Sequence, residues 1–270
     1  MKFLVYFFVF SFGLIIGSFL NCVIYRLLKK ESFLKNRSYC PHCKHTLKWQ
    51  DLIPIFSFLI LKGRCRYCKK SISFQYPLVE FATASLFTFI IFQNLGFLFS
   101  TPFIFWLLNI CFLFLVSSFL IIIFVYDLKH YIIPDKVIYP AILVSCVWYL
   151  ISSIFFSLYT KYYILNTIYS AFGAAFFFLA IVLLTRGKGM GMGDVKLAFF
   201  MGLLLGFPNI LVALFLSFFL GAVIGIILII RGKKTFKSEV PFGPFLVTGT
   251  FLALFLGERI ISFYFRSLLL

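Results

Sequence analysis

The stretch GMGMGDVK, residues 189–196, lies where two long apolar runs of the sequence meet. Its three glycines, at alternate positions, let the backbone turn tightly and leave room for another chain segment to approach. The stretch places an acid, Asp194, and a base, Lys196, where a membrane segment would meet water. Because an ionisable group at the edge of hydrocarbon is costly, this position predicts a functional site.

The composition of the chain is that of a membrane protein. The 270 residues are 63% hydrophobic and 21% aromatic, which is more apolar surface than a soluble core can hide. Repeated apolar runs of about twenty residues predict an all-α polytopic membrane protein. The run at 195–207 is short for a full span, which predicts a tilted or re-entrant helix there. We therefore expect about eight transmembrane helices, at 3–25, 78–93, 102–126, 137–156, 163–185, 195–207, 209–230 and 243–265.

The distribution of charge predicts the topology. The chain has 25 basic and 8 acidic residues, a net charge of +17. In a membrane protein such an excess indicates loop topology and contact with anionic lipid, and we expect no nucleic-acid partner. The segment 26–77 carries twelve of the basic residues and two of the acidic ones, so the positive-inside rule predicts that it is cytoplasmic and that both termini lie outside.

Three parts follow from this topology. We expect a first transmembrane helix at 1–25, a cytoplasmic loop domain at 26–77, and membrane-embedded helices at 78–270. Within the loop, the less polar part from Leu52 to Leu61 is expected on the membrane surface. The sequence shows no internal repeat and no low-complexity tract.

A second carboxylate, Asp127, ends an apolar run as abruptly as Asp194 begins one. The predicted topology places both at the cytoplasmic boundary. Two carboxylates a few ångströms apart share one proton, because both cannot ionise cheaply. One can then deprotonate a water molecule while the other protonates a substrate carbonyl. The pair therefore predicts peptide hydrolysis without a metal or a covalent intermediate.

Simpler interpretations of these acids stay open. Asp194 could be an N-cap of the helix that follows it, and Asp127 a solvated residue at a helix end near Lys129. Asp135 competes with Asp127, but it follows Pro134 in a turn-like stretch before an apolar run. We favour Asp135 as a helix cap.

The polar loop contains two CxxC pairs, Cys40 with Cys43 and Cys65 with Cys68. Their spacing is close to a common four-thiolate zinc pattern. A cytosolic loop disfavours disulfides, and the surrounding lysines and arginines favour thiolates. We expect a structural zinc ion that folds a loop without a core of its own. Redox chemistry is the alternative, and His42 or His45 could replace a cysteine ligand.

The first apolar run contains GSFLNC, residues 17–22. Gly17, Ser18 and Asn21 lie at helical spacing and form a small and polar stripe suited to close helix contact. We favour a packing seam over a role in substrate contact. Cys22, Cys111 and Cys146 lie in apolar runs and are expected to be packing residues.

Ordered motifs along the whole chain support a family resemblance. They are GSFLNCVIYR at 17–26, the two cysteine pairs, YPLVE at 76–80, Asp127 followed by Ile133-Pro134-Asp135, GMGDVK at 191–196 and PFGPF at 241–245. The chain resembles the bacterial type IV prepilin peptidases, which are bifunctional leader peptidase/N-methyltransferases. GMGDVK is similar to the GxGD motif of aspartyl membrane proteases.

The resemblance implies an activity, a substrate and a location. Asp127 and Asp194 would be the catalytic pair, in the bacterial inner membrane. The supporting motif residues would be Gly191, Gly193, Lys196, Pro134, Asp135, Gly243 and Pro244. The substrates would be prepilins or pseudopilins, cleaved at the cytoplasmic face between a basic leader and an apolar helix. The new N-terminal residue would then be methylated with S-adenosylmethionine.

The resemblance assigns no ligands for S-adenosylmethionine. Glu80 is the acid to test first, and a structural role at the membrane edge is the equal alternative. Two other classes of function stay open: a proton-coupled transporter, and a non-enzymatic assembly factor with a zinc loop. A transporter would be expected to place acids nearer mid-span and to show duplicated halves. The oligomeric state is not predicted.

Overall fold

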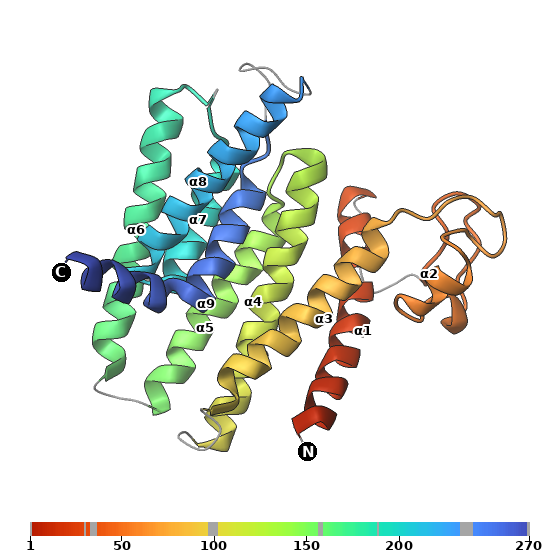
Figure 1. Ribbon diagram of the computed structural model, residues 1–270, viewed down its shortest axis with the longest axis horizontal. Coiled ribbons are helices and arrows are strands. Elements are labelled where there is room, and N and C mark those ends of the chain that lie inside the picture. Colours follow the sequence, from red (N-terminus) through yellow and green to blue (C-terminus); the bar gives the residue numbers. More distant parts are fainter. Residues whose placement is uncertain are drawn as a thin grey trace. The chain divides into compact units, whose positions relative to one another are not determined.

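The computed structural model describes residues 2–29, 31–32, 37–96, 102–155, 159–187, 189–232 and 240–268. The chain divides into two compact units, Met1–Ile122 and Ile123–Leu270. Regular structure in the described ranges is helical, apart from two isolated β-bridges (Figure 1). The division predicted from the sequence, with boundaries at 25 and 77, stays a prediction.

The first unit consists of two long helices, a polar loop and the start of a third helix. Its elements are α1 (Lys2–Lys29), η1 (Trp49–Asp51), α2 (Phe56–Ile60), α3 (Gln75–Asn94) and the first part of α4 (Phe103–His130). A Cβ added to Gly13 would lie 2.5 Å from the Cα of Ala84, and one added to Gly17 would lie 2.6 Å from the Cα of Glu80. The predicted packing seam is therefore confirmed as the contact between α1 and α3.

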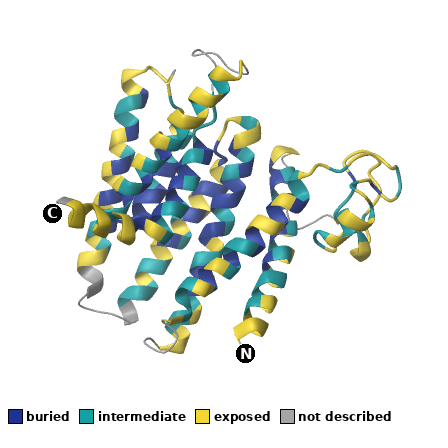
Figure 2. Ribbon diagram, viewed as in Figure 1, coloured by how far each residue is buried: buried dark blue, intermediate teal, exposed yellow. Residues whose placement is uncertain are grey.

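The second unit surrounds a short central helix. It contains the end of α4, then α5 (Asp135–Phe155), α6 (Tyr159–Leu184), α7 (Met192–Leu205), α8 (Asn209–Ile230) and α9 (Gly243–Leu268). Helix α7 contacts α5, α6, α8 and α9, and from Leu197 to Leu205 most of its residues are buried (Figure 2). Close backbone approach makes this possible, because a Cβ on Gly202 would lie 2.4 Å from the Cα of Ala171 in α6.

Seven of the described helices are long and apolar enough to cross a membrane: α1, α3, α4, α5, α6, α8 and α9. Helix α7 has 14 residues, which rise about 21 Å at 1.5 Å per residue. A bilayer core is about 30 Å thick. The predicted run at 195–207 is therefore a helix at Met192–Leu205 that is too short to cross on its own.

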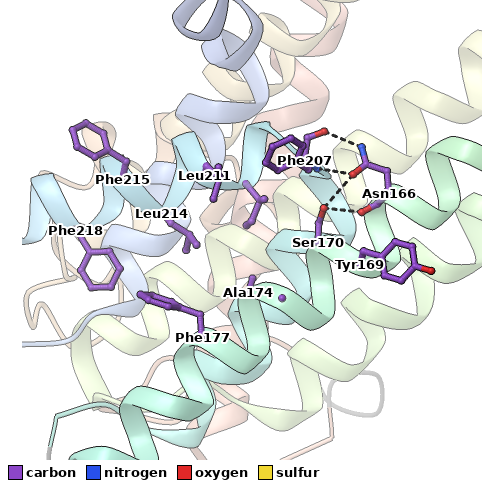
Figure 3. A pocket seen from close by; sticks show the side chains of 12 residues that line it. Asn166, Tyr169, Ser170, Ala174, Phe177, Phe207, Leu211, Leu214, Phe215 and Phe218 are labelled. Carbon is purple, nitrogen blue, oxygen red and sulfur yellow. Dashed lines mark hydrogen bonds between the residues drawn. The ribbon is translucent and has the colours of Figure 1, made fainter. Parts of the chain in front are cut away.

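An open groove of about 600 Å³ lies along α6 and α8 (Figure 3). Aromatic and aliphatic side chains such as Phe177 and Phe215 line most of it. Its polar end is the Asn166 amide, which donates to the Phe207 carbonyl at 2.8 Å and accepts from the Phe207 N–H at 3.2 Å. The amide thereby satisfies backbone groups that the break between α7 and α8 leaves outside a helix.

Candidate active site

Asp127 lies near the C-terminal end of α4 and is 4% exposed. Its Oδ2 accepts a hydrogen bond from the backbone N–H of Gly243, at 2.9 Å. Gly243 is the first residue of α9, so the positive end of that helix is directed at the carboxylate. A Cβ on residue 243 would lie 2.6 Å from the same oxygen, so a glycine is required for this approach.

Asp194 lies in the first turn of α7, which begins after the N-cap Gly191. Its Oδ2 accepts a hydrogen bond from the Gly191 N–H at 3.2 Å. The capping interpretation is therefore correct in part, because the carboxylate does cap α7, but from the third helical position and not from the N-cap itself. One oxygen of Asp194 is used in this way.

The charge of Asp127 affects the ionisation of Asp194. Asp194 lies outside the seven spanning helices, and burial raises its pKa to about 6. The Gly191 N–H opposes this rise, and the negative charge of Asp127 adds to it. The charge of Asp127 thus reaches Asp194 from the end of another helix. That the two acids form a catalytic pair stays a prediction. A pair of this kind holds a proton more readily than either acid alone.

The connection between α4 and α5 packs against the start of α7 and forms an ion pair with it. A Cβ on Gly193 would lie 3.1 Å from the Cβ of Ile133. Lys196 Nζ lies 2.6 Å from Asp135 Oδ1 and 5.0 Å from the centre of the Tyr139 ring. Hydrogen bonds with Asp135, and then with Tyr139, raise the pKa of Lys196. Asp135 thus faces the lysine of the motif that contains Asp194.

Two supporting prolines lie where helices begin. The Pro134 carbonyl accepts from the Val137 N–H at 2.9 Å and from the Ile138 N–H at 3.1 Å, so it starts α5, whose first residue is Asp135. Asp135, which we predicted to cap the helix, is therefore its first residue, and its carboxylate binds Lys196. Pro244 is in the first turn of α9, where a missing N–H costs no helical hydrogen bond.

The four predicted cysteine ligands come together in the first unit. The Sγ atoms of Cys40, Cys43, Cys65 and Cys68 all lie within 4.8 Å of one another, and those of Cys40 and Cys68 are 3.9 Å apart. A tetrahedral zinc with Zn–S bonds of about 2.3 Å separates its sulfurs by about 3.8 Å. The donor set and its spacing therefore fit Zn²⁺. The His45 ring lies against the Tyr67 ring, with centroids 3.7 Å apart and the planes tilted by 36°, and it is not in the cluster.

The loop that contains the four cysteines, residues 37–74, has a donor set that fits a metal, and we call it the metal-binding loop. Its two halves are structural repeats, which the sequence analysis missed. The Cys40 N–H donates a hydrogen bond to the His45 carbonyl, and the Lys44 N–H donates one to the Cys40 carbonyl. The same two hydrogen bonds recur 25 residues later, where the Cys65 N–H donates to the Lys70 carbonyl and the Lys69 N–H donates to the Cys65 carbonyl. The bridges Tyr39↔Thr46 and Arg64↔Ser71 obey the same offset. The matching positive φ angles at Lys44 and Lys69 show that each half closes through the same turn.

Asp51 joins η1 to the second half of the loop. It accepts from Arg66 Nε at 2.7 Å and from the Tyr67 hydroxyl at 3.1 Å. Burial opposes the charge of Asp51, but the hydrogen bonds from Arg66, from the Lys48 N–H and from Tyr67 hold its pKa below the usual range.

Glu80, the acid that we would test first for a role in methyl transfer, is buried in α3. Its Oε2 accepts a hydrogen bond from the backbone N–H of Ile55, at 2.7 Å. The carboxylate therefore ties the polar loop to a spanning helix. This contact supports the structural alternative for Glu80 and does not test a role in methyl transfer.

These features define a class: a multi-pass α-helical membrane protein with two electrostatically coupled acids and a four-thiolate loop. Residues 11–94 match the bacterial Peptidase A24 N-terminal domain, and residues 114–226 match the type IV leader peptidase family. The chain belongs to the type IV leader peptidase family.

Relatives match the chain over nearly its whole length. A prepilin leader peptidase/N-methyltransferase of Bacillus subtilis is 34% identical, over 96% of this chain and 98% of the relative. Proteins with the same name from Aeromonas hydrophila and Legionella pneumophila are 32% and 31% identical. The match to the Aeromonas protein covers 97% of this chain and 94% of that relative. The match to the Legionella protein covers 94% of this chain and 92% of that relative. No solved structure gives a significant match.

Proposed function

We propose that this chain cleaves the leader of prepilins or pseudopilins and then methylates the new N-terminal residue. Asp127 and Asp194 act as the peptidase pair. The observation that carries this proposal is that helix starts supply backbone N–H groups to both carboxylates. The charge of Asp127 adds to the raised pKa of Asp194. The names of the relatives support the substrate class and the second activity.

The chemistry follows from one proton shared by two acids. The ionised carboxylate takes a proton from a water molecule, and the resulting hydroxide attacks the scissile carbonyl carbon. The protonated carboxyl gives its proton to the carbonyl oxygen, which forms a neutral tetrahedral intermediate. When the C–N bond breaks, the carboxyl that took the proton from water gives it to the leaving amine, and the other carboxylate takes a proton from a hydroxyl of the intermediate, which restores the shared proton. The Gly243 N–H orients one Asp127 oxygen throughout.

The topology proposed from charge fits this chemistry. We place the protein in the bacterial cytoplasmic membrane, with both termini outside and the acids at the cytoplasmic face. A substrate whose apolar helix lies in the bilayer would then present its leader junction to the pair. Membrane lipid is the other partner that seven apolar helices require.

The metal-binding loop has a structural role in this proposal. Cys40, Cys43, Cys65 and Cys68 would hold Zn²⁺ and thereby join the two repeated halves. S-adenosylmethionine supplies the methyl group when it is bound. The residues that hold it are not assigned.

The test uses the purified protein and a prepilin in detergent. Asp127→Asn and Asp194→Asn keep the shape of each side chain but remove its acidity, so each is expected to abolish leader cleavage. Asp51→Asn changes a carboxylate of the loop and should leave cleavage intact. Cleavage that persists in either pair variant would reject the peptidase pair and favour a non-enzymatic assembly role.

A further inference from the structure

An apolar surface remains uncovered on the metal-binding loop. We call it the α2 surface; it consists of Trp49, Leu52, Ile53, Phe56, Leu59 and Ile60, each classed as exposed. Phe56, Leu59 and Ile60 are 60%, 63% and 74% exposed, and Figure 2 shows α2 largely in the exposed colour. Several large apolar side chains exposed within one short segment indicate a binding surface.

The α2 surface is one face of a segment whose other face is already packed. Phe58 lies against Phe74, with ring centroids 6.1 Å apart. A Cβ on Gly63 would lie 3.1 Å from the Phe58 ring. The fold of the loop thus uses Phe58 and directs its neighbours Phe56 and Leu59 outward. Folding of the loop by itself gives no reason for these outward residues to be apolar.

A hydrogen bond sets the depth of α2 relative to a spanning helix. The Ile55 N–H, just before α2, donates to Glu80 at 2.7 Å. Glu80 is the sixth residue of α3, about 7.5 Å along the helix from its start. Helix α3 has 20 residues, about 30 Å, which is the thickness of the hydrocarbon core. With α3 spanning the core along its whole length, the start of α2 lies level with the outer part of the bilayer and not above it.

The charge around the α2 surface indicates which kind of lipid it meets. Residues 37–74 contain eight lysines and arginines and one acid, Asp51. That acid is engaged with Arg66. Lys48, Lys62 and Arg64 flank the apolar residues and are exposed. Cations beside an inserted apolar face are typical of binding to an anionic membrane interface.

We propose that the α2 surface inserts into the headgroup region of an anionic bilayer and seats the metal-binding loop there. Glu80 is the positioning residue, because its carboxylate holds the Ile55 N–H at the required depth. Apolar side chains enter the upper part of the acyl region, and the flanking cations meet the lipid phosphates. This inference does not depend on the peptidase or methyltransferase assignment.

The test places a fluorescent reporter on the α2 surface of the full-length protein in lipid nanodiscs. The background replaces the three native tryptophans, Trp49, Trp106 and Trp148, with phenylalanine, and Ile60→Trp adds one reporter. Thr46→Trp, at an exposed site in the first half of the loop, is the matched control. Circular dichroism checks that each variant keeps its helix content.

The reporter at 60 is expected to have a blue-shifted emission maximum and to lose intensity with lipids brominated near the headgroup. Bromines deep in the acyl chains should quench it less, because interfacial segments lie only about 5–10 Å into the bilayer. Quenching should increase when anionic phosphatidylglycerol replaces part of the phosphatidylcholine. The reporter at 46 should instead be quenched by acrylamide in water.

Each other outcome would overturn part of the proposal. A reporter at 60 quenched by acrylamide alone would show that α2 faces water, and one protected from both quenchers would show that protein covers it. Equal quenching in neutral and anionic discs would remove the role of the cations. Glu80→Gln retains an acceptor for Ile55 and should keep the reporter's depth, whereas Glu80→Ala should make it shallower. An unchanged depth in Glu80→Ala would overturn the positioning role.

Discussion

The carboxylate site and the metal-binding loop are built in opposite ways. Asp127 meets Gly243 across 116 positions of sequence, so the site exists only when several helices pack. The loop instead repeats one local turn at an offset of 25 residues. Leader cleavage should therefore be sensitive to how closely helix backbones approach in the second unit. The folding of the metal-binding loop should instead depend on its four cysteine ligands.

The largest effect is expected from crowding the carboxylate site. In Gly243→Ala, the new Cβ would meet Asp127 Oδ2 at 2.6 Å, so the start of α9 must move. A displacement of about 1 Å at a catalytic site costs about 100-fold in rate, and we expect kcat for leader cleavage to fall by about that factor. Gly225→Ala in α8, where no atom lies within 4 Å of the added Cβ, is the control and should cleave normally.

A smaller effect is expected from pH. Because the pKa of Asp194 is raised to about 6, the pair keeps its shared proton below that pH and loses it above. Cleavage by wild type, followed as kcat/KM, should therefore decline as pH rises through this region, by up to about tenfold per pH unit. A rate that stays constant from pH 5 to 8 would contradict a shared proton.

The ion pair of Lys196 and Asp135 should matter less. Its side chains are 28% and 59% exposed, so solvent screens the attraction, and pairs of this kind contribute about 1 kcal/mol or less. Lys196→Ala and Asp135→Ala should each lower cleavage by roughly fivefold or less. The double variant should be no worse than either single one. Additive losses would show that the two residues act separately.

The smallest effect on cleavage is expected from changes in the metal-binding loop. Such a change tests directly whether the loop and the carboxylate site are independent. Cys68→Ser should abolish zinc binding and reduce hydrogen-exchange protection of residues 38–72, because a metal holds the two halves together. Leader cleavage should change little and methylation should fall. Cys146→Ser, at an exposed position in α5, should retain zinc. A Cys68→Ser protein that lost cleavage as completely as methylation would show that the two regions depend on each other.

Local sequence pattern was sufficient to predict the spanning helices, the cysteine cluster and one helix contact. Apolar runs predicted the spanning helices, and paired cysteines predicted the cluster that the structure forms. The small-residue stripe predicted the contact between α1 and α3. These features depend on side-chain chemistry and helical period, which can be read along the chain. Asp127 and Asp194 became candidates because ionisable groups at the ends of apolar runs are costly.

Only the tertiary structure decided which partners those residues have. The Gly243 N–H on Asp127, the Ile55 N–H on Glu80 and the Lys196–Asp135 pair join residues from 25 to 116 positions apart. It also showed that α7 is too short to cross and that Asp194 caps it from the third position. Such contacts depend on how segments that are far apart in the sequence approach one another, which a local pattern does not encode.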